Sequence, residues 1–235
     1  MLDKEIVQTL SKVTTATLTT ILFKKGLRNV WLRKTAPLFT NQPRVVGEAF
    51  TMRFVPARED IATPAAWSSP KSTRVAVEAM PDGCVVVADA MGISDAGILG
   101  DILCARMHQK GVAGLVTDGA LRDRSGLAQA DLPIWCSGVA APPAVAQLAF
   151  VDWQETIGCG GVAVIPGDII VADEDGAVVI PAALLNEVVD TALAQEQSET
   201  WVLQQVKAGA ALSGLYPMSV ENQARYEADL KAGRI

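Results

Sequence analysis

Hydrophobic positions near the N-terminus recur every three or four residues. This spacing predicts helix over residues 2–25, with a possible restart at Thr14 and an end near Gly26, where a glycine can close the last turn. Residues 27–45 lack a period and are expected to be irregular. From 46 to 54 apolar and polar residues alternate, which is typical of a half-buried strand.

The middle of the chain carries short, continuous apolar runs of the kind found in strands buried on both faces. We expect these strands at residues 84–89, 112–117, 133–136, 169–173 and 177–180. A helix is expected over residues 101–110. Pro181 opens a second helical pattern that runs to about residue 207, and a short polar helix is expected over 220–231. With no internal repeat, the pattern predicts one α/β domain over residues 1–235, with terminal helices at 1–26 and 182–235 that pack on the core or on neighbouring subunits.

Charge and hydropathy narrow the choice of partners. The net charge is −6, so the chain should repel phosphate backbones and nucleic acid is not an expected partner. No apolar run reaches the roughly 18 residues of a membrane span, so no membrane association is expected. The charged start shows no apolar signal core, which predicts a cytoplasmic location.

Cysteine and histidine content excludes several kinds of chemistry. The four cysteines, Cys84, Cys104, Cys136 and Cys159, are far apart, so we expect small buried side chains rather than disulfides or a zinc site. His108 is the single histidine, which excludes a zinc site with several histidine ligands within one chain. It lies in a predicted helix without a nucleophile motif nearby, so a Ser-His-Asp triad is not expected.

A glycine-bounded loop before the 101–110 helix is the first candidate for a binding site. Gly97 and Gly100 let the backbone turn sharply and approach a ligand. The free N–H groups of Ile102 and Leu103 in the first helical turn suit a carboxylate or phosphate. Asp101 lies at the mouth of this site, and its alternative role is to cap the helix.

The second candidate is Arg122-Asp123, which follows a buried strand and a turn. Arginine can hold a carboxylate in a two-pronged fork, and aspartate can bind a hard cation. The alternative is an ordinary surface ion pair. Asp89 and Asp95 are assigned to turn chemistry, and the glycines at 158–161 to a demanding turn rather than to a phosphate cradle.

Together these segments resemble a known family. The Gly97–Asp101 loop, the block from Asp118 to Asp123, the strand at 133–135 and the stretch from 166 to 181 are similar to the family that unites 4-hydroxy-4-methyl-2-oxoglutarate aldolases with the regulator of ribonuclease activity A. The likeness covers most of the chain. It implies a swivelling β/β/α-type domain, a homotrimer or homohexamer, and a Mg²⁺ or Mn²⁺ site between subunits.

The resemblance also implies roles for individual residues. Arg122 would bind the pyruvyl unit of a 2-oxo acid and steady its enolate, and Asp123 would hold the metal. Asp101 would assist catalysis through water held by the metal. Backbone groups at Gly100, Ile102 and Leu103 would bind the substrate carboxylate. The alternative aldolase chemistry needs a desolvated lysine. All lysines here fall in predicted helices or loops, which favours the metal route.

The sequence departs from the family between residues 58 and 74, a long segment that contains Trp67. We expect Arg58, Lys71 or Arg74 to contact the distal part of the substrate, with a solvated loop as the alternative. Glu196 and Glu199 are candidates, by location alone, for an acid contributed to a neighbouring subunit. No motif supports that role, so it is not assigned.

Two functions follow. The first is a divalent-metal-dependent lyase that releases pyruvate from a branched or dicarboxylic 4-hydroxy-2-oxo acid, or decarboxylates oxaloacetate. The second is a non-catalytic ring that binds and regulates a ribonuclease. Asp101, Arg122 and Asp123 favour the first, because a pure binding protein would not need these groups together.

Overall fold

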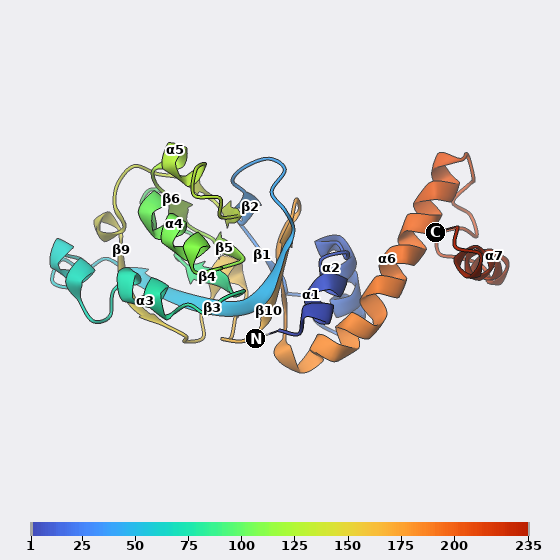
Figure 1. The fold of residues 1–235 in the computed structure, drawn as a ribbon, viewed down its shortest axis with the longest axis horizontal. Helices are drawn as coiled ribbons and strands as arrows, with labels where there is room; N and C mark the ends of the chain where they lie inside the picture. The colour runs from blue at the N-terminus through green and yellow to red at the C-terminus, as the bar shows by residue number, and fades with distance from the viewer. Residues whose placement is uncertain (1, 235) are drawn as a thin grey trace.

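The computed structural model describes residues 2–234, in which nine strands form one curled sheet flanked by helices (Figure 1). The strands are β1 (Trp31–Leu32), β2 (Ala36–Pro37), β3 (Val45–Pro56), β4 (Val85–Asp89), β5 (Gly114–Thr117), β7 (Ile134–Cys136), β9 (Leu148–Trp153), β10 (Ile169–Asp173) and β11 (Gly176–Ile180). Their order is β1-β11-β10-β3-β4-β5-β7-β2, and β9 pairs separately with β3. Two short strands, β6 (Ala120–Leu121) and β8 (Gly138–Val139), pair in parallel beside this sheet.

The long strand β3 organises the sheet. It pairs antiparallel with β10 near its start, parallel with β4 along its middle, and antiparallel with β9 over its last five residues. The register with β9 shifts between Arg53 and Phe54. Such an irregularity bends a strand and re-aims the side chains beyond it. The extra residue, Val151, belongs to β9, so β3 keeps its alternation and Phe54 packs in the same core as Phe50 and Met52.

Alternate residues of the parallel strands feed two separate cores. Val86 of β4 faces helices α3 (Thr73–Ala79), α4 (Asp101–Gln109) and α5 (Arg124–Leu127), whereas Val87 faces the inside of the curl. Trp135 of β7 fills that inside, and its indole N–H donates to the carbonyl of Asp173 in β10 at 2.6 Å. This contact joins strands from opposite halves of the sheet and closes the curl.

Terminal helices cover the β10–β11 side through a third core. These helices are α1 (Lys4–Leu10), α2 (Thr15–Lys24) and the first half of α6 (Leu185–Lys207). The buried carboxylate of Asp173 fixes the start of α2, because it accepts bonds from the Thr15 N–H at 2.8 Å and the Thr15 hydroxyl at 2.6 Å. A buried carboxylate needs such partners to offset its desolvation.

The last part of α6 and helix α7 (Val220–Lys231) extend away from the body of the molecule (Figure 1). We call residues 200–234 the C-terminal arm. The arm has its own small core around Trp201 and Tyr226, whose rings meet edge to face at 5.8 Å. Several of its large apolar side chains are exposed: Leu203, Leu212, Tyr216 and Val220.

The expected mixed α/β fold with flanking helices is confirmed, with corrections of detail. The predicted helix over 2–25 is two helices, and the restart falls at Thr14, whose hydroxyl accepts from the Thr17 N–H at 3.2 Å. The segment expected to be irregular, 27–45, contains β1 and β2, which are too short to produce a period. Among residues 2–234, no helix combines the length and apolar character needed to cross a bilayer.

Candidate active site

Two loops that lie side by side bring the candidate residues together. The loop that follows β4 runs parallel to β6, with the Ile98 N–H donating to the Ala120 carbonyl at 2.9 Å. One step further along, the Arg122 N–H donates to the Leu99 carbonyl at 3.0 Å. This backbone pairing places the start of α4 beside Arg122 and Asp123.

Asp101, Arg122 and Asp123 line one cavity of about 360 Å³. Gly100, Ile102 and Leu103, the predicted carboxylate-binding groups, line the same cavity. Within it, the Arg122 Nε atom lies 3.2 Å from the Asp123 Oδ2 atom, and each side chain is roughly two-fifths exposed. The three side chains therefore share an environment that a small anion and a cation can reach.

Glycines make this convergence possible, because they have no side chain to fill the space. A Cβ atom on Gly100 would lie 2.5 Å from the Asp123 Oδ2 atom, and one on Gly126 would lie 2.0 Å from the Asp101 Oδ2 atom. Both distances are far below normal contact, so each carboxylate occupies space that only glycine leaves open. Gly97 is equally constrained, because its Cβ would lie 2.7 Å from the Arg122 Cβ atom.

Asp123 adopts a backbone conformation that is unusual for a residue with a side chain. Its φ and ψ are 63° and 47°, in the left-handed region. This conformation costs on the order of 1 kcal/mol and is often found at functional positions. Asp123 occupies the N-cap position of α5, yet its carboxylate makes no capping bond and turns to Arg122 instead.

Asp101 differs in detail from its expected role. The helix α4 begins at Asp101 itself, and Gly100 is the N-cap, without a capping side chain. The Asp101 Oδ1 atom accepts from the Ile102 N–H at 2.7 Å. In this state the Ile102 donor is already engaged, so a substrate carboxylate would reach it only after the Asp101 side chain rotates.

The donor set suits a hard divalent cation. Among residues 2–234, no three His, Cys, Asp or Glu side chains form a cluster able to enclose a metal. Mg²⁺ is commonly bound by only one or two carboxylates and keeps several waters, so it does not need such a cluster. The Asp123 carboxylate fits this mode of binding, because it is partly exposed and makes no capping bond. Asp101 lines the same cavity.

The segment between β3 and α3 forms part of the cavity lining. Lys71 and Arg74 line it as expected, but Arg58 does not: its Nε atom is paired with the Asp60 Oδ1 atom at 2.6 Å. Sequence analysis missed further lining residues, among them Phe54, Leu148 and Phe150. Alternation predicted a half-buried strand over residues 46–54, but the pattern carried no signal that Phe54 faces a cavity.

Other candidates lie elsewhere. Glu196 accepts from the Thr14 N–H at 3.0 Å and Glu199 from the Thr17 hydroxyl at 3.2 Å, so within one chain both stabilise the start of α2. Asp89 performs the expected turn chemistry, accepting from the Met91 N–H at 2.9 Å. His108 is exposed on α4, and the four cysteines are buried and unpaired, as expected.

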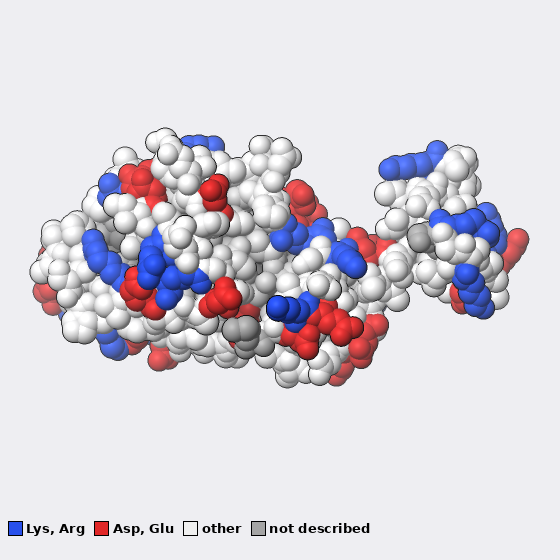
Figure 2. All heavy atoms as spheres, in the orientation of Figure 1, with Lys and Arg blue, Asp and Glu red and all other residues white. Residues whose placement is uncertain are grey.

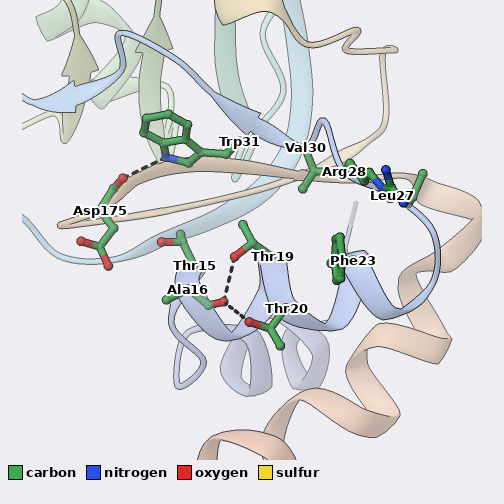
Figure 3. Close-up of a pocket in the computed structure, with 10 residues that line it drawn as sticks. All are labelled: Thr15, Ala16, Thr19, Thr20, Phe23, Leu27, Arg28, Val30, Trp31 and Asp175. Atoms are coloured by element: carbon green, nitrogen blue, oxygen red, sulfur yellow. Dashed lines mark hydrogen bonds between the residues drawn. The ribbon is translucent and has the colours of Figure 1, made fainter.

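A larger groove of about 550 Å³ lies between α2 and the β1 edge (Figure 3). Several of its polar groups already have internal partners. The Thr19 and Thr20 hydroxyls donate to the Ala16 carbonyl, and the Trp31 indole N–H donates to the Asp175 carbonyl at 2.9 Å. Size alone therefore does not make this groove the active site, and none of the predicted chemistry lies in it.

Two features together indicate the class of protein. One is the curled mixed sheet, and the other is an arginine–aspartate pair beside a helix whose start is flanked by glycines. The chain belongs to the RraA-like family, because the Aldolase/RraA family model matches residues 15–179, more than half of its length. The family expected from the sequence is therefore confirmed.

Individual relatives point to both branches of the family. A Halalkalibacterium halodurans protein named "Putative 4-hydroxy-4-methyl-2-oxoglutarate aldolase" is 35% identical over 156 residues, which cover 66% of this chain and 68% of that protein. The structure of Streptomyces coelicolor RraAS2, described as an unusual member of the RNase ES inhibitor RraA protein family, is 35% identical with a TM-score of 0.78. It covers 87% of this chain and 100% of that one.

One relative is much longer than the region it shares with this chain. Protein DlpA of Legionella pneumophila is 28% identical over 169 residues, which are 72% of this chain but 26% of DlpA. The chain therefore spans about a quarter of that protein.

Proposed function

We propose that this chain is a divalent-metal-dependent lyase that releases pyruvate from 4-hydroxy-2-oxo acids and can decarboxylate oxaloacetate. The observation that carries the proposal is the convergence of Asp101, Arg122 and Asp123 on one cavity, in space that Gly100 and Gly126 leave open. The aldolase name of the 35% identical relative supports it.

Arg122 would provide the main fixed positive charge. Cleavage of the C3–C4 bond leaves an electron pair that spreads onto the C2 oxygen as an enolate. A guanidinium held beside that oxygen stabilises the charge as it develops, which lowers the barrier. The Leu99–Arg122 backbone bond fixes where the side chain starts, so less reorganisation is needed during the reaction.

Asp101 would handle the proton. Its carboxylate lies in the same cavity, where it can take the proton of the C4 hydroxyl as the bond breaks and return one to C3 of the enolate. Rotation of Asp101 away from Ile102 would release the Ile102 N–H at the start of α4 for the substrate carboxylate. Substrate binding and base positioning are then linked by one side-chain movement.

Asp123 would hold the Mg²⁺ or Mn²⁺ ion. Such a cation supplies Lewis-acid stabilisation of negative charge on the substrate oxygens. The bond from Arg122 Nε keeps the Asp123 carboxylate turned toward the cavity. We also propose a homotrimer or homohexamer with the metal site between subunits, and the exposed apolar side chains of the C-terminal arm support association of copies.

The test is a pyruvate-release assay on the purified full chain with oxaloacetate and 4-hydroxy-2-oxoglutarate. We expect activity with Mg²⁺ or Mn²⁺ and its loss with chelator. Arg122→Ala should lower kcat/KM by about 10³-fold, in the range that loss of a transition-state charge contact produces. Arg124→Ala is the matched control, because its guanidinium lies over the Phe39 ring and outside the cavity. No pyruvate release with either metal, from these substrates or from 4-hydroxy-2-oxo acids with an apolar branch, would end the proposal.

Likeness to the ribonuclease-inhibitor structure supports a second function, the binding and regulation of a ribonuclease. In the view of Figure 2, acidic and basic side chains are mixed over the body of the molecule. Ribonuclease binding that persists in Arg122→Ala, in a chain that releases no pyruvate, would favour this function over the lyase.

A further inference from the structure

The lining of the candidate active-site cavity falls into two chemically different groups. One is the charged group of Asp101, Arg122 and Asp123. The other, which we call the wall, comes from the end of β3, the β3–α3 connection and β9, and it is mainly apolar: Phe54, Ile61, Ala66, Trp67, Leu148 and Phe150. Phe54 and Phe150 meet edge to face at 5.2 Å, which fixes this part of the wall.

The cations on this wall are held by the protein itself. Lys71 forms an ion pair with Asp152 of β9. The Arg74 guanidinium lies 5.7 Å from the centre of the Trp67 ring, and its NH1 atom donates to the Trp67 carbonyl at 3.1 Å. Together these contacts hold the wall segment against α3 and β9. They also turn the two charges toward internal partners.

Exposure points to a ligand for the apolar part. Ile61 and Trp67 are each 40% exposed, although both line the same cavity as the charged group. A substrate of only three or four carbons would fill a small part of a 360 Å³ cavity and leave these side chains in water. Ligand sites are usually lined by apolar groups with a few polar groups that fix orientation, and this wall matches that pattern.

We propose that the substrate is a 4-hydroxy-2-oxo acid whose C4 substituent is an apolar branch, alkyl or aryl, seated against Ile61, Trp67 and Phe150. This inference rests on the proposed lyase function and narrows it from dicarboxylic to apolar substrates. In the reaction the C3–C4 bond breaks and its electrons pass to the pyruvate enolate. The C4 hydroxyl loses its proton to the site base, and C3 of the enolate gains one. The products are pyruvate and an apolar aldehyde or ketone.

A pair of substrates with the same shape tests the proposal. 4-Hydroxy-6-methyl-2-oxoheptanoate carries an isobutyl group where 4-hydroxy-2-oxoadipate carries a carboxymethyl group, and both release pyruvate. We expect the full chain with Mg²⁺ to prefer the isobutyl compound by about tenfold or more in kcat/KM, since each buried methylene contributes about fourfold. A preference for the adipate would overturn the inference and leave the lyase function standing, whereas no pyruvate from either compound would remove the lyase function itself.

Variants locate the preference on the wall. Ile61→Ser should lower the ratio of isobutyl to adipate turnover severalfold. Val75→Ser is the matched control, because Val75 is 41% exposed on α3 but does not line the cavity, and its ratio should equal that of the parent chain. Arg74→Gln examines the opposite interpretation. A selective loss of adipate turnover in this variant, together with a parent chain that prefers adipate, would assign the wall to a distal carboxylate.

Discussion

Gly100→Ala separates the geometry of the site from the stability of the fold. The backbone at Gly100 has φ −124° and ψ −175°, an extended conformation that alanine adopts without strain. The added Cβ atom would nevertheless lie 2.5 Å from the Asp123 Oδ2 atom and 3.3 Å from the Arg122 Cγ atom. The nearest obstacle is the end of a side chain, so the backbone can stay in place while the Asp123 carboxylate moves.

The structure gives the size of both effects. To reach even the shortest contact that real Cβ atoms make, 3.0 Å, the carboxylate must move by about half an ångström. Displacements approaching 1 Å can cost about 10²-fold in rate, so we expect kcat/KM for pyruvate release to fall by about 10- to 100-fold. Stability should change little. Alanine is a poorer N-cap than glycine, but it reduces unfolded-state entropy, and each effect is about 1 kcal/mol or less.

The assay pairs steady-state pyruvate release with thermal unfolding. Gly158→Ala is the control, because Gly158 has an ordinary φ of −118° and its Cβ would have only the Asp89 Oδ2 atom within reach, at 4.0 Å. It should retain both activity and Tm. If Gly100→Ala keeps full activity, the position of the Asp123 carboxylate does not matter for the reaction. That result would refute the proposal that Asp101, Arg122 and Asp123 act together in one cavity.

Three further predictions concern the surrounding fold. Gly97→Ala should destabilise the protein by about 1–3 kcal/mol in chemical denaturation, because its Cβ would meet the backbone of Arg122 and the Ala140 carbonyl at 2.9 Å. Asp118→Asn should destabilise it by about 1–3 kcal/mol, since the carboxylate accepts three backbone N–H bonds and an amide cannot accept all of them. Burial raises the pKa of Asp118 above its ordinary 3.8. Just above pH 3.8 the folded state therefore binds more protons than the unfolded chain. The contribution of Asp118 to the free energy of unfolding then falls as the pH rises to the pKa of the folded state. Asp118→Asn should remove this pH dependence. Burial also raises the pKa of Cys84 and Cys104 to about 12, so a thiol reagent at neutral pH should label neither until the chain is unfolded.

Much of the fold could be predicted because its signals are local. Continuous apolar runs marked the buried strands β4, β5, β10 and β11, since each is buried on both faces. Thr14 marked the start of α2 through its hydroxyl. The short strands β1 and β2 had no such signal, because two residues cannot establish a period and their pairing depends on β11 and β7.

The predicted site depends on glycines in a way that the sequence shows only in part. Gly97 and Gly100 were identified as flexible loop residues. Their role in the structure is different, because neither has a positive φ and each is needed for the space that a missing Cβ leaves. Gly126 gave no signal at all, since its neighbour Asp101 lies 25 positions away in the chain. Only the fold reveals that the two residues touch.

The apolar wall of the cavity explains why a substrate preference could not be read from the residues alone. Ile61 and Trp67 belong to a stretch rich in Pro, Ser and charge, which resembles a solvated loop, and the cations within it suggested recognition of an acid. Three features of the structure reverse that interpretation. Asp152 of β9 pairs with Lys71, the Trp67 ring and carbonyl hold Arg74, and the register shift beside Phe54 lets β9 bring Phe150 to the same wall. The charges that looked available for a ligand are used to build the wall, and the surface left for a ligand is apolar. The specificity that we propose for this chain therefore depends on which side chains the protein itself has already paired.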